Sequence, residues 1–305
     1  MIIQLFLFIN FLNLISNDLI PHIIHFAWFS ENPKPELVKN CISSWRKYSP
    51  GWLIIQWTIE MIYPFENDFI KEAYKLKKYA FVADYLRVFS LYNFGGVYID
   101  SDVELKAKLD PFLNHSFFIS QSRDKWLHVA PDCYGSMKGH PILKEMLKYY
   151  KNNHFIKKDG TLDETWVGII FTRKIKKLYN IKLSNKIQNA ISLPDNGSIY
   201  PTFYFEQEIK GKLNIANHYC TGSWKGNKYN DEKILANCYF DCRNDLKEKR
   251  NIKFNREKFK NKNLSHNIEL LLVNFLVLIF DIILKLFYLF GKKKSLLLND
   301  RIYLK

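Results

Sequence analysis

The stretch from Phe94 to Leu105, FGGVYIDSDVEL, constrains the fold more than any other part of the chain. Two glycines lead into a run of β-branched and aromatic residues, a pattern that predicts a short buried strand. The strand ends in Asp100 and Asp102. Because side chains alternate along an extended chain, we expect both carboxylates to point the same way. Ligands of open α/β sheets bind beyond the carboxyl ends of strands, so this end of the strand is a candidate site.

The two carboxylates need an electrostatic partner. Acidic groups a few ångströms apart repel each other, and one keeps its proton unless a cation lies between them. Mg²⁺ or Mn²⁺ meets that need, because hard divalent cations bind carboxylate oxygens and often keep substrate phosphates as further ligands. A solvated turn is the alternative, since Asp and Ser are common after strands. The pair alone leaves both interpretations open.

The segment Lys77–Gly96 precedes this strand and reads KKYAFVADYLRVFSLYNFGG. Its apolar positions predict a largely buried helix that ends near Asn93 to Gly95, where Asn and Gly are stop signals. Asp84 and Arg87 are three residues apart and share one face of this helix. Charged groups in so apolar a helix need partners. They form either a structural ion pair or a polar clamp that faces the cleft beside Asp100.

Three sequence blocks carry a family resemblance. IPHIIHFAWFS, LVKNCISSWRKYSPGWLIIQW and KKYAFVADYLRVFSLYNFGGVYIDSDVEL follow in this order between Ile20 and Leu105. Together they resemble glycosyltransferase family 32, which contains capsular-polysaccharide sugar transferases and fungal mannosyltransferases and is related to the glucosylating clostridial toxins. Weaker similarity continues through DCYGSMKGHPIL, SIYPTFYF and NHYCTGSW, to about residue 225. The resemblance implies an α/β GT-A fold, which is a Rossmann-like mixed sheet flanked by helices.

The resemblance also implies an activity, a metal-dependent, retaining transfer of a hexose. The donor would be a nucleotide sugar, a UDP- or GDP-sugar, and the acceptor a saccharide or another glycan. Trp28 would stack on the nucleotide base, and Asp84 and Arg87 would hold the hydroxyl groups of the donor sugar. Ser223 and Trp224 would lie on a loop that closes over the diphosphate.

The metal ligands follow from the same resemblance. Asp100 would contact the ribose or the sugar and take part in the metal shell. Asp102 would bind Mn²⁺ or Mg²⁺ directly, and His218 would supply a late metal ligand. The expected catalytic set is therefore Asp84, Arg87, Asp100 and Asp102. A lone histidine is more often structural, so the assignment of His218 depends on its place before TGSW.

Three other functions compete with this interpretation. A phosphatase of the haloacid-dehalogenase type also places an Asp-x-Asp after an apolar strand, with Asp100 as its nucleophile. A relative that binds a sugar nucleotide without turnover is the second alternative. A nucleic-acid binder is the third, because the net charge is +15. The basic surplus is concentrated after Arg243, however, and no nucleic-acid-binding motif is present, so we expect no nucleic-acid partner.

The two ends of the chain differ from its middle. We expect a hydrophobic leader or anchor at 1–19, the GT-A catalytic domain at 20–242 and a basic linker at 243–263. The last part, 264–305, reads as a hydrophobic helix with a basic tail.

The C-terminal helix is expected to associate with a membrane. Asn267, Asn274 and Asp281 recur every seven residues and form a narrow polar stripe on an otherwise apolar helix. Such a helix suits the interface of an anionic membrane, with the flanking lysines on lipid head groups. Whether it spans the bilayer, lies in the interface or packs as a soluble core helix is left open by the sequence.

Overall fold

The computed structural model describes residues 19–30, 32–62, 67–124, 126–183 and 188–221, all within one compact unit. In chain order the elements are β1 (Ile23–Ala27), α2 (Glu36–Tyr48), β2 (Leu53–Trp57), η1 (Ile59–Met61), α3 (Asp68–Lys75), α4 (Tyr79–Phe94), β3 (Gly96–Ile99), β4 (Val103–Leu105), η2 (Asp110–Phe112), β5 (Phe117–Gln121), β6 (Val129–Ser136), α5 (Pro141–Asn152), α6 (Val167–Tyr179), β7 (Ile191–Ser192), β8 (Ser198–Tyr200), α7 (Thr202–Phe205) and β9 (Ala216–His218). Within these ranges, no helix has both the length and the apolar character needed to cross a bilayer.

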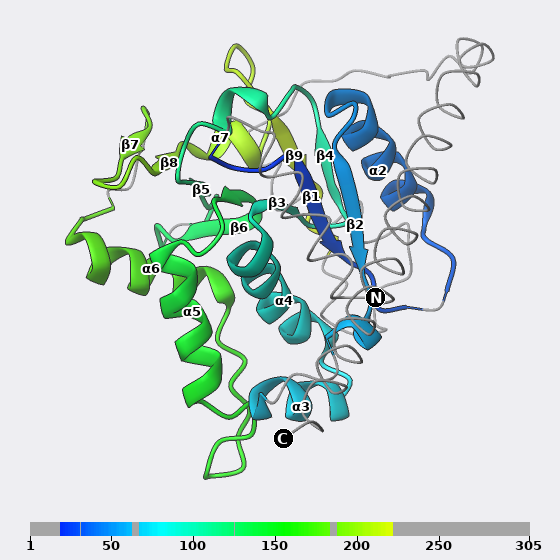
Figure 1. The fold of residues 1–305 in the computed structure, drawn as a ribbon, viewed down its shortest axis with the longest axis vertical. Helices are drawn as coiled ribbons and strands as arrows, with labels where there is room; N and C mark the ends of the chain where they lie inside the picture. Colours follow the sequence, from blue (N-terminus) through cyan, green and yellow to red (C-terminus); the bar gives the residue numbers. More distant parts are fainter. Residues whose placement is uncertain (1–18, 31, 63–66, 125, 184–187, 222–305) are drawn as a thin grey trace, which may run out of the picture. The chain divides into compact units, whose positions relative to one another are not determined.

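The main sheet has seven strands in the order β2-β1-β3-β6-β5-β8-β7 (Figure 1). β1 runs parallel to β2 on one side and to β3 on the other. β6 runs antiparallel to β3 and to β5, whereas β8 runs parallel to β5 and antiparallel to β7. β4 and β9 form a separate antiparallel pair. The predicted mixed α/β sheet flanked by helices is therefore confirmed.

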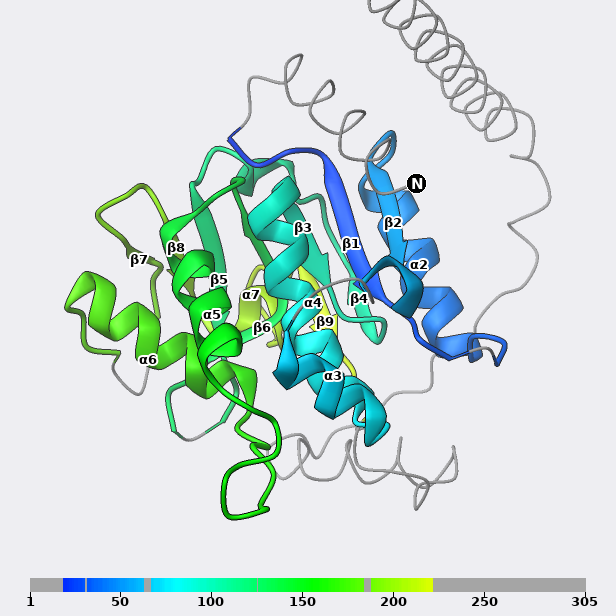
Figure 2. The same ribbon diagram turned by 60° about the horizontal axis from the view of Figure 1, so that its bottom comes forward.

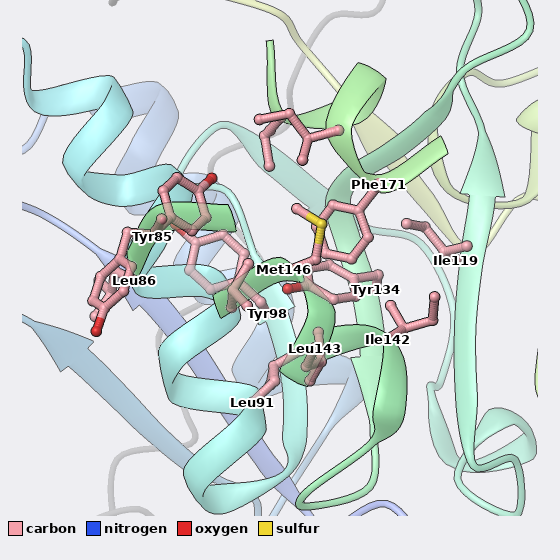
Figure 3. Packing of buried hydrophobic residues seen from close by; sticks show 14 of the residues in the cluster. Tyr85, Leu86, Leu91, Tyr98, Ile119, Tyr134, Ile142, Leu143, Met146 and Phe171 are labelled. Atoms are coloured by element: carbon pink, nitrogen blue, oxygen red, sulfur yellow. The ribbon is translucent and has the colours of Figure 1, made fainter. Parts of the chain in front are cut away.

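Each face of the sheet packs against its own set of helices, because alternate residues of each strand point to opposite faces. On β3, Val97 and Ile99 belong to the apolar cluster that α2 covers, whereas Tyr98 belongs to the cluster covered by α3, α4, α5 and α6. Figure 2 shows α3, α4, α5 and α6 together on one side of the sheet. Figure 3 shows Tyr98 in the same cluster as Met146 of α5 and Phe171 of α6.

The turn from α4 into β3 depends on two glycines. α4 ends at Phe94 and is capped by Gly95, whose N–H donates to the carbonyl of Leu91 at 2.9 Å, so the predicted end of this helix is confirmed. Gly95 and Gly96 have φ angles of +70° and +107°, which L side chains rarely adopt. A Cβ on Gly96 would lie 2.6 Å from the carbonyl oxygen of Ile23. The absence of a side chain at this position therefore lets β3 lie directly against β1.

Replacement of Gly96 by alanine is expected to destabilise the fold more than the same change at Gly51. Gly51 also has a positive φ, +80°, but an added Cβ there meets nothing within 4 Å. Gly51→Ala therefore carries only the backbone cost, about 1–2 kcal/mol. Gly96→Ala adds the clash with Ile23 and is expected to exceed the control by about 1–3 kcal/mol. Denaturant unfolding of both variants measures the difference, and equal losses would contradict this account of the turn.

Candidate active site

The chain reverses direction across the sheet between β1 and β3. From β1 it passes through α2 to β2 on one side, whereas β3 lies on the other side of β1. The carboxyl ends of two parallel strands at such a switch point form the usual ligand crevice of open α/β sheets. Trp28 follows β1 and Asp100 follows β3. Two of the predicted site residues are therefore placed at the two sides of the switch point.

Trp28 is held by its backbone and keeps a half-exposed ring. Its N–H donates to the carbonyl of Trp57 at 3.1 Å, which continues the pairing of β1 with β2. The ammonium group of Lys34 lies 5.6 Å from the centroid of the Trp28 ring. A half-exposed indole at a ligand crevice suits the predicted stacking on a nucleotide base, and that role stays a prediction.

The two aspartates of the motif lie in a turn. The N–H of Val103 donates to the carbonyl of Asp100 at 3.0 Å, which closes the turn directly after β3. The expectation that an extended chain from Asp100 to Asp102 points both carboxylates the same way is therefore wrong about the backbone, which turns at Ser101 and Asp102. The physical reason is that β4 leaves the main sheet to pair with β9, so the backbone must bend after Ile99. The two carboxylates remain at the same edge of the sheet, but they have different partners.

Asp100 joins the charged pair of α4. One guanidinium nitrogen of Arg87 lies 2.9 Å from Asp84 Oδ1 and 3.3 Å from Asp100 Oδ1. The other terminal nitrogen donates to the carbonyl of Pro131 at 2.7 Å, and the guanidinium carbon lies 5.0 Å from the centre of the Tyr98 ring. Arg87 is buried. The predicted pair on one helix face is confirmed, and Arg87 also contacts Asp100. The role of the pair as a clamp for the donor stays a prediction.

The charges of this triad are unbalanced. Burial raises the pKa of Asp84 to about 6, although the charge of Arg87 opposes the shift. Burial also raises the pKa of Asp100 to about 6, against the opposing charges of Arg87 and His218. One guanidinium therefore does not fully compensate the buried Asp84 and the partly buried Asp100, and a further cation at Asp100 would favour its ionised form.

Asp102 is bound by the segment around β9. Its Oδ2 accepts hydrogen bonds from both the N–H and the hydroxyl group of Thr221, each at 2.8 Å. Its Oδ1 lies 3.4 Å from His218 Nε2. Burial alone would raise the pKa of Asp102, but His218 and Thr221 outweigh it and hold the pKa well below its ordinary value. The structure therefore brings together Asp102 and His218, which are 116 residues apart in the sequence.

Two acidic residues that the sequence interpretation missed complete this cluster. Asp132, within β6, has its Oδ2 atom 2.5 Å from His218 Nδ1, and Glu206 Oε1 lies 3.8 Å from the same nitrogen. Burial and the neighbouring Glu206 raise the pKa of Asp132. Burial opposes ionisation of Glu206 as well, but its contacts with Asp132 and His218 outweigh burial and lower its pKa. His218 has a pKa well above its ordinary value, because these carboxylates and Asp102 outweigh its burial.

These residues fit a divalent cation. Ligand atoms of Asp132, Glu206 and His218 all lie within 4.8 Å of one another, and Asp102 lies on the other side of the imidazole. The Oδ2 atom of Asp132, which lies 2.5 Å from His218 Nδ1, is buried. Carboxylate oxygens with one imidazole nitrogen are a donor set that Mn²⁺ and Mg²⁺ accept. Asp102 and His218 of the predicted ligand set are adjacent, and Asp100 lies on the same edge.

Several predicted features lie outside the described residues. They are Ser223 and Trp224, residues 1–18 of the leader, the linker at 243–263 and the C-terminal helix at 264–305. The predicted catalytic domain, 20–242, is described up to residue 221, apart from short gaps.

The family of the central region is decided by residues 35–119. They match the family model described as "Glycosyltransferase sugar-binding region containing DXD motif". The chain carries a glycosyltransferase DXD sugar-binding region. The DXD of this region is Asp100-Ser101-Asp102, and Asp84 and Arg87 lie in it as well. The resemblance stated from the sequence is therefore confirmed for this region, and the phosphatase alternative is not retained.

Curated proteins that match parts of this chain include fungal mannosyltransferases. Inositol phosphoceramide mannosyltransferase 1 of Schizosaccharomyces pombe is 34% identical over 147 residues, which cover 44% of this chain and 44% of that protein. Mannosyl phosphorylinositol ceramide synthase CSH1 of Saccharomyces cerevisiae is 31% identical over 242 residues, 74% of this chain and 58% of that protein. The aligned stretches thus span about half the length of these two relatives. Among solved structures, the PaToxG glycosyltransferase matches with a TM-score of 0.40 and 16% identity, over 58% of this chain and 77% of that one.

Proposed function

We propose that this chain is a metal-dependent mannosyltransferase that uses a nucleotide-activated mannose and acts on the head group of an inositol-containing lipid. The observation that carries the proposal is the set of contacts made by the two aspartates of the DXD motif. Asp102 lies against His218, and Asp100 lies against Arg87, which also pairs with Asp84. The names of the relatives support mannose as the sugar and an inositol phosphoceramide as the kind of acceptor. A glycan acceptor, expected from the sequence, is the second candidate.

Different side chains of the site would bind different parts of the donor. When bound, Mn²⁺ or Mg²⁺ supplies positive charge to the oxygens of the leaving diphosphate, an effect worth several kcal/mol. Asp102 and His218 would hold that cation, with Asp100 beside them. Asp84, fixed by Arg87, offers carboxylate oxygens to the sugar hydroxyl groups. Trp28 offers its half-exposed ring to the base. These roles extend the resemblance to a GT-A enzyme with retention of configuration, which is part of the proposal.

A donor screen tests the proposed function. GDP-mannose, UDP-glucose, UDP-galactose and UDP-N-acetylglucosamine are each incubated with the full chain and Mn²⁺, with and without an inositol phosphoceramide in detergent. The proposal expects release of a nucleoside diphosphate from the mannose donor, with transfer to the lipid, and loss of both in EDTA. Consumption of a UDP-sugar with no use of GDP-mannose would refute the assignment of mannose. No turnover with any donor would favour the inactive, sugar-nucleotide-binding relative.

The activity is expected to fall on acidification through about pH 6. The pKa values of Asp84 and Asp100 are raised to about 6, so both lose their charge as the pH falls below that value. Neutral carboxyl groups hold neither Arg87 nor a cation, and kcat/KM for the donor should drop between pH 7 and pH 5. A higher Mn²⁺ concentration should move the midpoint to lower pH, because a cation favours the ionised forms. A flat profile from pH 7.5 to pH 4.5 would contradict this assignment.

We also propose that residues 264–305 attach the enzyme to an anionic membrane, where a lipid acceptor would be reached. The support is the narrow polar stripe and the flanking lysines, both read from the sequence. The full chain is expected to sediment with vesicles that contain phosphatidylserine and to do so less with purely zwitterionic vesicles. A chain ending near residue 250 should lose this binding and keep donor hydrolysis. Equal sedimentation of the two chains would refute the proposed attachment.

A further inference from the structure

We propose that Asp132 is a positioning residue that orients His218, so that the Nε2 atom of this histidine binds the metal ion together with Asp102. The inference rests on the proposed metal-dependent function and decides between two faces of one imidazole. A cation could bind at Nδ1, with Asp132 and Glu206, or at Nε2, with Asp102. The two arrangements give Asp132 opposite roles, as a direct ligand or as the support of a ligand.

The contacts favour the Nε2 face. His218 Nδ1 already has Asp132 Oδ2 at 2.5 Å, Cys220 Sγ at 3.5 Å and Glu206 Oε1 at 3.8 Å. Nε2 lies 3.4 Å from Asp102 Oδ1. Two ligands of one cation at metal distances of about 2.0–2.2 Å lie about 3 Å apart, so this pair needs little movement to share an ion. Asp102 Oδ1 is also the oxygen that faces away from the two Thr221 hydrogen bonds, which both end on Oδ2.

The backbone of His218 is fixed independently of its ring. Its N–H donates to the carbonyl of Glu206 at 3.1 Å. One guanidinium nitrogen of Arg123 donates to the carbonyls of both Glu206 and His218, each at 2.9 Å, and Arg123 Nε lies 3.3 Å from Glu206 Oε2. Arg123 and Glu206 therefore hold the main chain. The shortest contact of the imidazole ring is with Asp132, at 2.5 Å, whereas Asp102 and Cys220 Sγ lie at 3.4 and 3.5 Å.

The chemistry of metal-bound histidines explains why such a support matters. A histidine that binds a metal through one ring nitrogen usually directs the other N–H to a carboxylate or carbonyl, which fixes the tautomer and the ring orientation. Loss of that partner typically weakens metal binding by about 10–100-fold. Asp132 is buried, and its Oδ2 lies 2.5 Å from His218 Nδ1, the ring nitrogen opposite Asp102.

The test is a titration of the full chain with Mn²⁺, in which electron paramagnetic resonance measures the bound ion. GDP is present and no sugar donor is added. Asp132→Ala is expected to weaken Mn²⁺ binding by about 10–100-fold. Asp132→Asn, which keeps an oxygen acceptor, should weaken binding less, and Asp102→Asn should weaken it most. Asp195→Ala is the matched control, because Asp195 also lies against a buried histidine, His140, at 3.1 Å, but at the other end of β5. It should leave Mn²⁺ binding unchanged.

Three results would overturn the proposal. They are an unchanged Mn²⁺ affinity in Asp132→Ala, a loss of affinity in Asp132→Asn as large as in Asp102→Asn, and no Mn²⁺ binding by the wild-type chain.

If Asp132→Ala does not fold, a measurement on the wild-type protein decides which ring nitrogen binds the metal. With ¹⁵N-labelled histidine and Zn²⁺ as a diamagnetic ion, His218 should show a protonated Nδ1 and a metal-bound Nε2. Its resonances are assigned by their loss in His218→Gln, and the reverse pattern would place the metal on the Asp132 side.

The metal titration and the sugar assay test different proposals, so that each proposal can be refuted without the other. Mn²⁺ binding that follows the predicted order, with no use of a nucleotide sugar, would refute the proposed function and leave the role of Asp132 intact. Metal-dependent mannosyl transfer with an Asp132→Ala variant that binds Mn²⁺ normally would refute only the role of Asp132.

Discussion

Replacement of Asp102 by asparagine is expected to reduce metal-stimulated turnover by about 10²–10³-fold, the rate equivalent of several kcal/mol of lost charge stabilisation. The physical reason is that the amide removes one negative charge from the proposed cation site. The fold should survive, because an asparagine oxygen still accepts a hydrogen bond from the N–H of Thr221, at the place where Asp102 Oδ2 accepts it at 2.8 Å. Steady-state assays with the nucleotide sugar at several Mn²⁺ concentrations measure the effect.

Asp110→Asn is the control for this variant. Asp110 is exposed in η2 and also lies in the matched family region, so the change removes the same charge away from the proposed site. Its activity should match the wild type. An Asp102→Asn enzyme with full turnover, or a wild-type enzyme that keeps its activity in EDTA, would show that the cation does not act at this residue.

Replacement of Arg87 by methionine is expected to lower the free energy of unfolding by about 3–5 kcal/mol at pH 7.5, because it leaves buried carboxylates without their partner. Arg87 has only 8% of its side chain exposed, and its two partners, Asp84 and Asp100, have 12% and 24%. The loss should shrink at pH 5, since both carboxyl groups have pKa values raised to about 6 and become neutral there. Donor binding should be lost together with the ordered Asp84.

The matched control is Lys78→Met, which breaks the ion pair of Lys78 with Glu164 at 2.6 Å. These side chains are 40% and 49% exposed, and exposed pairs contribute about 0–1 kcal/mol. Denaturant unfolding at both pH values compares the two variants. If Arg87→Met were as stable as Lys78→Met at pH 7.5, the buried triad would not be an electrostatic centre of the fold.

Local patterns predicted the parts of the site that are close in sequence. The apolar positions of α4 and the glycines after it correctly located the end of that helix, and the three-residue spacing placed Asp84 and Arg87 on one face. These features depend on helix periodicity and turn chemistry, which act over a few residues. The alternation argument failed at Asp100 and Asp102 for the opposite reason. The pairing of β4 with β9, a contact between distant segments, bends the chain there.

The same limit explains the residues that the sequence interpretation missed. Asp132 lies beside Asp100 because β6 runs antiparallel to β3, and the N–H of Asp100 donates to the carbonyl of Asp132 at 2.7 Å. Glu206 and Arg123 reach His218 through contacts between segments that are distant in the sequence. The available signals were weak, since Asp132 opens the block DCYGSMKGHPIL and Glu206 follows SIYPTFYF directly. Neither block indicates by itself which partner its acidic residue meets.

The binding of GDP-mannose to the full chain tests the central claim most directly. It is measured by isothermal titration calorimetry, once with Mn²⁺ and once in EDTA. That claim is that the sheet edge with Asp100, Asp102 and His218 is a metal-dependent nucleotide-sugar site. The account predicts saturable binding with Mn²⁺, loss of binding in EDTA, and loss in Asp102→Asn at the same Mn²⁺ concentration. Binding of equal strength with and without the metal, or unchanged binding in Asp102→Asn, would contradict it.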